Sequence, residues 1–259
     1  SRKKENIIKE IEKLVEEGFK EIILIGINLG AYGEDLDEGE NFESLLKSIL
    51  EINKLQRVRI GSVYPDKISD EFINMFDNKK LMPHLHISLQ SCDDEVLKRM
   101  RRKYGSSLIE ERLLKLKKKV KNMEYTADVI VGFPGETEEM FQNSYNLIEK
   151  IGFSGIHIFQ YSDRENTIAS SFTDKIDAKV KKERADRLEV LKSEMAKKER
   201  KKYLGKHLSV LLEEKINGYL YGYSENYLRV KIKDNGIEVN SIIDIKINSL
   251  EKEMLIAYE

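Results

Sequence analysis

The sequence has almost no cysteine: Cys92 is the only one among 259 residues. A single thiol excludes a disulfide within the chain and a metal cage built from several cysteines. It also fits a reducing compartment, where disulfides are rare. Long apolar runs are missing as well, since none approaches the roughly 18 residues that cross a membrane. Because no signal peptide opens the chain either, we expect a soluble, cytoplasmic protein with no membrane partner.

An excess of charge of one sign is also missing. The chain has 45 Lys and Arg against 46 Asp and Glu, for a formal net charge of −1. Net charge therefore does not mark it as a polyanion binder, and any basic surface must be local. One local run exists, because residues 98–121 hold eleven Lys and Arg against two acidic residues. Such a run is more often a solvated helix face than a binding surface.

Strand-like and helix-like patterns alternate through the first 203 residues. Apolar or alternating segments predict strands, and amphipathic segments between them predict helices. The predicted strands are 21–27, 57–63, 84–90, 125–131 and 155–160. Five strands that alternate with helices predict an α/β fold with a parallel sheet, either doubly wound or part of a barrel.

The pattern changes at Gly205, where short strand-like segments follow one another closely. They are 206–213, 219–223, 227–232, 241–247 and 254–258. Five short strands in so few residues predict a small antiparallel β-barrel of the oligonucleotide-binding kind. The sequence therefore predicts two domains, residues 1–203 and residues 204–259.

Two turns that follow predicted strands are candidate ligand sites. The apolar run that ends at Val131 is followed at once by Gly132-Phe-Pro-Gly135, and the first strand is followed by Gly26 and Asn28. Glycine lets backbone approach a ligand closely, and ligands of α/β proteins bind at the carboxyl ends of strands. An ordinary βα turn explains the first pattern about equally well. A flexible loop explains the second better, because short glycine motifs are weak signals.

Polar residues share one face of the third predicted strand. His84, His86, Ser88 and Gln90 alternate there, and inside a barrel they would form a polar wall. Two histidines suggest a metal, but no third ligand is apparent, so we predict no metal site. Arg164, after the last strand, is a candidate clamp for a carboxylate.

These motifs occur in a distinctive order along the chain. The blocks are LIGINLGAYGEDL, RIGSVYPDKISDE, PHLHISLQS with DEVLKRMRRKY, TADVIVGFPGETEE, GFSGIHIFQYSDRENT, and LGKHLSVLLEE with GYSENYLRV. In this order they resemble the radical S-adenosylmethionine (radical-SAM) methylthiotransferases over essentially the whole chain. The stretch HIFQYSDRE is most similar to the branch that modifies threonylcarbamoyladenosine beside the tRNA anticodon. Other branches act on isopentenyladenosine in tRNA or on an aspartate of a ribosomal protein.

The resemblance implies a partial TIM-like barrel of the radical-SAM type, followed by a small β-barrel called TRAM that holds RNA. It implies tRNA, through its anticodon stem-loop, as the partner, and S-adenosylmethionine (SAM) as the cofactor. The implied SAM-binding residues are Gly26, Asn28, Ser62, Gln90, Ser91, Asp128, Gly132, Phe133, Tyr161 and Arg164. The implied RNA-binding residues are Lys206, Tyr223, Asn226, Tyr227 and Arg229.

The chain departs from the family pattern in its cysteines. The CxxxCxxC segment and the domain before it are absent, and Cys92 stands where the family usually has glycine. The full-length enzyme would carry two [4Fe–4S] clusters, whereas this chain lacks the thiolates for one. We therefore expect a fragment that holds no cluster and is inactive alone. The alternative is an RNA-binding protein that kept the fold and lost catalysis.

The missing segment also predicts an open sheet edge. In the family, another strand pairs with the one that corresponds to residues 21–27. Without it, the apolar residues 22–25 would lie in an edge strand with unpaired backbone groups, and such edges invite pairing. We expect self-association through this strand, or its cover by the amino-terminal helix.

Overall fold

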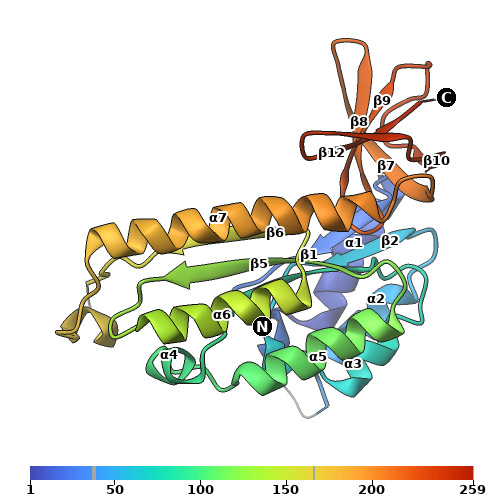
Figure 1. The fold of residues 1–259 in the computed structure, drawn as a ribbon. Helices are drawn as coiled ribbons and strands as arrows, with labels where there is room; N and C mark the ends of the chain where they lie inside the picture. The colour runs from blue at the N-terminus through green and yellow to red at the C-terminus, as the bar shows by residue number, and fades with distance from the viewer. Residues whose placement is uncertain (37–38, 166, 259) are drawn as a thin grey trace.

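The computed structural model describes residues 1–36, 39–165 and 167–258. Parallel strands and helices alternate through its first part, as the sequence predicts (Figure 1). The strands are β1 (Glu21–Leu24), β2 (Arg57–Ile60), β3 (Ser62–Val63), β4 (His84–Gln90), β5 (Glu124–Val131) and β6 (Gly155–Gln160). The helices are α1 (Lys4–Glu16), α2 (Phe42–Leu50), α3 (Asp70–Met75), α4 (Asp94–Arg99), α5 (Ser106–Lys119), α6 (Glu138–Ile151) and α7 (Ala178–Lys201). Short 3-10 helices are η1 (Leu29–Ala31), η2 (Pro65–Lys67) and η3 (Ile168–Ser171).

All strand pairs in this part are parallel. One sheet has the order β1-β2, and the other has the order β3-β4-β5-β6. Two of the strands are shorter than the sequence predicts. The first ends at Leu24, because Leu24 pairs with Ile60 and β2 ends there. The second is divided at Gly61, whose amide donates to the Leu24 carbonyl at 2.9 Å.

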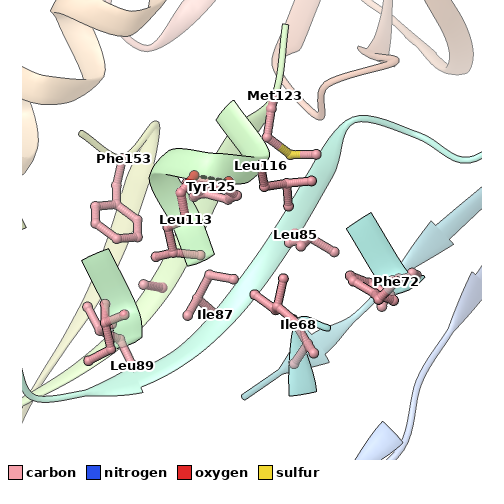
Figure 2. Close-up of a cluster of buried hydrophobic side chains, with 14 of the residues drawn as sticks. Ile68, Phe72, Leu85, Ile87, Leu89, Leu113, Leu116, Met123, Tyr125 and Phe153 are labelled. Carbon is pink, nitrogen blue, oxygen red and sulfur yellow. Dashed lines mark hydrogen bonds between the residues drawn. The ribbon is translucent and has the colours of Figure 1, made fainter. Parts of the chain in front are cut away.

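The core lies between the strands and the helices that cover one side of them. Figure 2 shows Leu85, Ile87 and Leu89 of β4 directed toward apolar side chains of α5 and of the segment around Ile68. Tyr125 is fully buried there, and its hydroxyl donates to the Leu113 carbonyl at 2.8 Å. The helices α5, α6 and α7 run along the sheet (Figure 1).

A second sheet follows α7 and projects from one end of the molecule (Figure 1). Its strands are β7 (His207–Ile216), β8 (Tyr219–Ser224), β9 (Arg229–Lys233), β10 (Ile242–Lys246), β11 (Ser249–Glu251) and β12 (Met254–Ala257). Their order is β10-β7-β8-β9-β12-β11, and the side chains between them form a hydrophobic cluster of their own. The expectation of five antiparallel strands is corrected in two respects. Ser249–Glu251 adds a sixth strand, and β12 pairs with β9 in parallel.

Two buried arginines of β2 join the two parts. Arg57 and Arg59 are only 3% and 2% exposed. Arg59 donates through Nε and Nη2 to the Glu21 carboxylate of β1, both at 3.0 Å, and through Nη1 to the Glu225 carbonyl at 3.1 Å. Arg57 donates to the Ser209 carbonyl at 2.7 Å. The arginines thus bind β1 and the backbone of the second sheet at once.

A further buried contact lies at the end of α7. The Tyr203 hydroxyl donates to Oε1 of Glu124 at 2.6 Å, and Oε2 of that carboxyl has no partner among the described residues. Burial is the main cause that raises the pKa of Glu124 to about 7. The carboxyl is therefore partly protonated near neutral pH, which lowers the cost of burying it.

We predict that Arg59→Met lowers the free energy of unfolding by about 3 kcal/mol, because it leaves the buried Glu21 carboxylate with only the more distant Arg57. Urea unfolding measures the loss. Arg112→Met is the matched control, since Arg112 pairs with exposed Asp70. The Arg112–Asp70 pair should contribute less than about 1 kcal/mol to the free energy of unfolding. Equal losses in the two variants would show that the buried pair does not stabilise the fold.

Candidate functional site

A cavity of about 630 Å³ lies where β4, β5 and β6 end. This volume is in the range of roughly 300–1,000 Å³ that is usual for small-molecule sites. Its walls come from the strand ends, from the turn after α4 and from the loop after β6. The lining residues are Gln90, Arg99, Met100, Arg101, Arg102, Asp128, Ile130, Phe133, Phe159, Gln160, Tyr161, Ser162, Arg164, Thr167, Ile168 and Ala169.

Gln90 enters the cavity through an unusual backbone conformation. Its φ is 66°, in the left-handed region that residues other than glycine rarely adopt, and the register of β4 against β5 shifts before it. Such strain costs on the order of 1 kcal/mol or more and is common at functional sites. The next residue, Ser91, turns into the core, where its Oγ lies 3.1 Å from Oγ of Ser144.

The turn after β5 is held by a buried ion pair. Gly132 and Gly135 have φ of 71° and 79°, and a Cβ at Gly132 would lie 2.1 Å from Cγ of Lys181. The Gly132 amide donates to the Glu136 carboxylate at 2.6 Å, and Arg184 of α7 donates to the same oxygen at 2.7 Å. Burial, the largest effect, raises the pKa of Glu136. The amide of Gly132 is therefore already engaged, and the turn offers the cavity the ring of Phe133.

The cavity is lined by more positive than negative charge. Four arginines line it, and Asp128 is the only acidic residue among the described lining residues. Arg99 is held by Asp174 at 2.7 Å and lies 4.9 Å from the ring centroid of Phe172. Arg164 is exposed, and its guanidinium has no ion-pair partner among the described residues. A ligand with an anionic group suits this charge distribution.

The predicted SAM-binding residues fall into three groups. Gln90, Asp128, Phe133, Tyr161 and Arg164 line the cavity, where the rings of Phe133 and Tyr161 meet edge to face at 5.1 Å. Gly26 and Asn28 line a separate cavity of about 470 Å³ between α1 and β1. Ser62, Ser91 and Gly132 line neither of these two cavities.

The arginines at positions 99, 101 and 102 are cavity residues that the sequence did not single out. They belong to the basic run 98–121, for which the sequence favoured a solvated helix face over a binding surface. The sequence signal that could have found them is their place at the end of the helix that follows β4 and in the turn after it. Loops at the carboxyl ends of parallel strands meet at one edge.

The described residues do not fit an iron–sulfur cluster. Cys92 is the only cysteine of the sequence, it is 1% exposed, and burial raises the pKa of its thiol. A [4Fe–4S] cluster needs several ionised thiolates.

Tyrosines and cations alternate across the outer face of β8 and β9. In the register of the two strands, Tyr219, Tyr221 and Tyr223 pair with Lys233, Lys231 and Arg229. Lys231 Nζ lies 4.4 Å from the Tyr219 ring centroid, and Arg229 Cζ lies 5.4 Å from that of Tyr221. Ion pairs with Glu214 and Glu251 balance part of the charge. We call this surface, formed by these six residues, the tyrosine–cation face.

The predicted RNA-binding residues do not all belong to this face. Tyr223 and Arg229 do, whereas Asn226 is fully buried and its Oδ1 accepts from the Ser224 hydroxyl at 2.6 Å. Tyr227 stacks on Tyr223 at 4.6 Å, but its ring also lies 4.7 Å from that of His84 at the junction. Lys206 lies over the ring of Tyr203. Burial therefore removes Asn226 from any RNA-binding surface.

No helix among the described residues is both long and apolar enough to cross a membrane.

Comparisons with known proteins agree with the fold. Residues 1–148 match the Radical SAM superfamily. The chain is 41% identical over 95% of its length to the threonylcarbamoyladenosine tRNA methylthiotransferase MtaB of Bacillus subtilis, of which it covers 56%. It is 39% identical over 82% of its length to the tRNA-2-methylthio-N(6)-dimethylallyladenosine synthase of Thermoanaerobacter sp. (strain X514), of which it covers 45%. The chain thus spans about half the length of these curated relatives.

A solved structure supports the same architecture. The radical SAM enzyme coproporphyrinogen III oxidase (HemN) from Escherichia coli superposes with a TM-score of 0.56 and 12% identity. The match covers 87% of this chain and 61% of that one. At this identity the likeness concerns the fold alone.

Proposed function

Because the chain belongs to the Radical SAM superfamily, we propose that its protein is a methylthiotransferase that acts on threonylcarbamoyladenosine in tRNA. The observation that carries the proposal is the pairing of a cavity for a small ligand with a tyrosine–cation face on a sheet fixed beside it. Its similarity to a threonylcarbamoyladenosine methylthiotransferase over 95% of the chain favours this substrate. A dimethylallyladenosine tRNA is the second candidate, because a relative with that name is 39% identical.

In this proposal the cavity binds SAM. Arg164 pairs with the methionine carboxylate, because its guanidinium is exposed at the rim and carries the charge that a carboxylate needs. The rings of Phe133 and Tyr161 contact the adenine, and Gln90 and Asp128 accept or donate hydrogen bonds at the ribose. Bound there, SAM would supply the adenosyl and methyl groups of the reaction. The residues of this chain position it and exclude water.

The experiment is nucleoside mass spectrometry of tRNA. The full reading frame that contains this chain is expressed in a strain without the modification, and the tRNA is digested. We expect methylthiolated threonylcarbamoyladenosine from the wild type, and a loss on the order of tenfold or more from Arg164→Ala, because a charge-assisted contact contributes about 1.5–3 kcal/mol. Arg112→Ala, on the surface pair, should leave the yield unchanged. If only methylthiolated dimethylallyladenosine forms, dimethylallyladenosine replaces threonylcarbamoyladenosine as the substrate. The absence of both methylthiolated nucleosides would contradict the proposed activity.

We propose that the tyrosine–cation face binds the tRNA. Base stacking on an aromatic ring contributes about 1–3 kcal/mol, and cations that contact phosphates release counterions. Tyr221→Ala should therefore weaken binding of an anticodon stem-loop by about 5- to 100-fold, measured by fluorescence anisotropy. Lys231→Ala should lower by about 1 the slope of the logarithm of affinity against the logarithm of salt concentration. Tyr258→Ala is the control, because Tyr258 is exposed outside this face. Unchanged affinity and slope in the first two variants would exclude this face.

Self-association through β1 is also proposed. Among the described residues β1 pairs with β2 alone, and Ile23, Ile25 and Ile27 are 47%, 82% and 102% exposed. An apolar edge of this kind favours pairing with a second chain. Ile23→Lys should shift the isolated chain toward monomer in sedimentation equilibrium. Val190→Lys, at an exposed position of α7, should not. A wild-type chain that is monomeric at all concentrations would contradict the proposal.

A further inference from the structure

Three possible metal ligands converge on one side of the sheet, one from each of three neighbouring strands. They are His86 of β4, Asp128 of β5 and His157 of β6. Nε2 of His86 lies 3.2 Å from Oδ2 of Asp128, and Asp128 is directly opposite His157 in the register. One ligand atom from each residue lies within 4.8 Å of the others. Of the two histidines that the sequence singled out, only His86 takes part, and the other two groups come from the neighbouring strands.

The Thr126 hydroxyl fixes the orientation of the His86 ring. Nδ1 of His86 lies 2.9 Å from Oγ1 of Thr126, its neighbour in the register, so Nε2 is the nitrogen directed at Asp128. Oγ1 of Thr126 also lies 3.1 Å from Nε2 of His84, which is buried. In protein metal sites, a polar partner on the second ring nitrogen orients the imidazole and makes it a better ligand. Thr126 provides this partner here.

We propose that His86, Asp128 and His157 bind one divalent transition-metal ion. Imidazole nitrogens suit zinc, iron, nickel and copper, and two histidines with one carboxylate leave further coordination positions open. With zinc–nitrogen bonds of about 2.0–2.1 Å, ligand atoms in a tetrahedral site are about 3.4 Å apart. The ligand atoms lie within 4.8 Å of one another, so the widest pair must approach by at most about 1.4 Å. His157 is exposed, so its side chain is free to make this movement.

The cluster adjoins the cavity and shares one residue with the SAM contacts proposed above. Asp128 belongs to both, whereas neither histidine is among the cavity-lining residues. The ion would lie next to the cavity wall, with its open positions available to water or to a ligand with oxygen donors. This inference does not depend on the proposed activity, because the three ligands are present whatever the enzyme modifies.

Titration with Co²⁺ under anaerobic conditions tests the site, because cobalt bound by histidine and carboxylate gives visible absorption bands. We expect saturable binding of one ion per chain, competed by Zn²⁺. His157→Ala and Asp128→Asn should each weaken it on the order of tenfold or more, since even residues that only support a ligand contribute that much. Circular dichroism verifies the fold of each variant.

The chain offers a matched control in His207→Ala. His207 also faces a carboxylate, with its Nδ1 2.5 Å from Oδ1 of Asp244, but on the exposed surface of the second sheet. Binding that persists in this variant and is lost in His157→Ala supports the site. A wild-type chain without one-to-one binding would overturn it. Equal weakening in His157→Ala and His207→Ala would overturn it too, because it would indicate nonspecific surface binding.

Discussion

The arrangement of the whole chain depends on a buried ion pair between Glu21 and Arg59. Removing two charges from water costs several kcal/mol for each ion, and this cost is offset only where geometry and further hydrogen bonds are good. Here both carboxylate oxygens accept from the guanidinium at 3.0 Å. The remaining donors reach carbonyls of the second sheet. The pair therefore binds β1 to β2 and also fixes the sheet that carries the tyrosine–cation face.

Parallel pairing is the second constraint, because it brings the carboxyl ends of β4, β5 and β6 to one edge. Several groups that could bind a ligand lie at or near this edge. They are the arginine-lined cavity, the strained Gln90 and the cluster of His86, Asp128 and His157. Glu136 and Arg184 hold the turn after β5, and this turn fixes the position of Phe133. A ligand would meet walls that are already formed, which lowers the ordering cost of binding.

The sequence predicted those parts of the fold that local patterns specify. Alternating periodicities gave the parallel α/β sheet, and the change of pattern at Gly205 gave the second sheet. It did not reveal the burial of Arg59, because the alternation in RVRI is the same whether water or another sheet covers the polar face. Nor did the sequence reveal the cluster of His86, Asp128 and His157. Asp128 and His157 are far apart in the chain, and only the register of β5 against β6 makes them neighbours. The resemblance implied Asn226 as an RNA-binding residue, but a motif does not show burial, and here Asn226 is fully buried beside Ser224.

The central claim is that the cavity and the tyrosine–cation face act on one RNA because Arg59 holds them in a fixed relation. Hydrogen exchange in the presence of an anticodon stem-loop that carries threonylcarbamoyladenosine tests it most directly. We expect slower exchange in β8 and β9 together with slower exchange in residues 161–165 and 167–169 of the cavity loop. In Arg59→Met, protection should remain on the sheet and fall in the loop. Protection confined to one of the two regions in the wild type would contradict the claim.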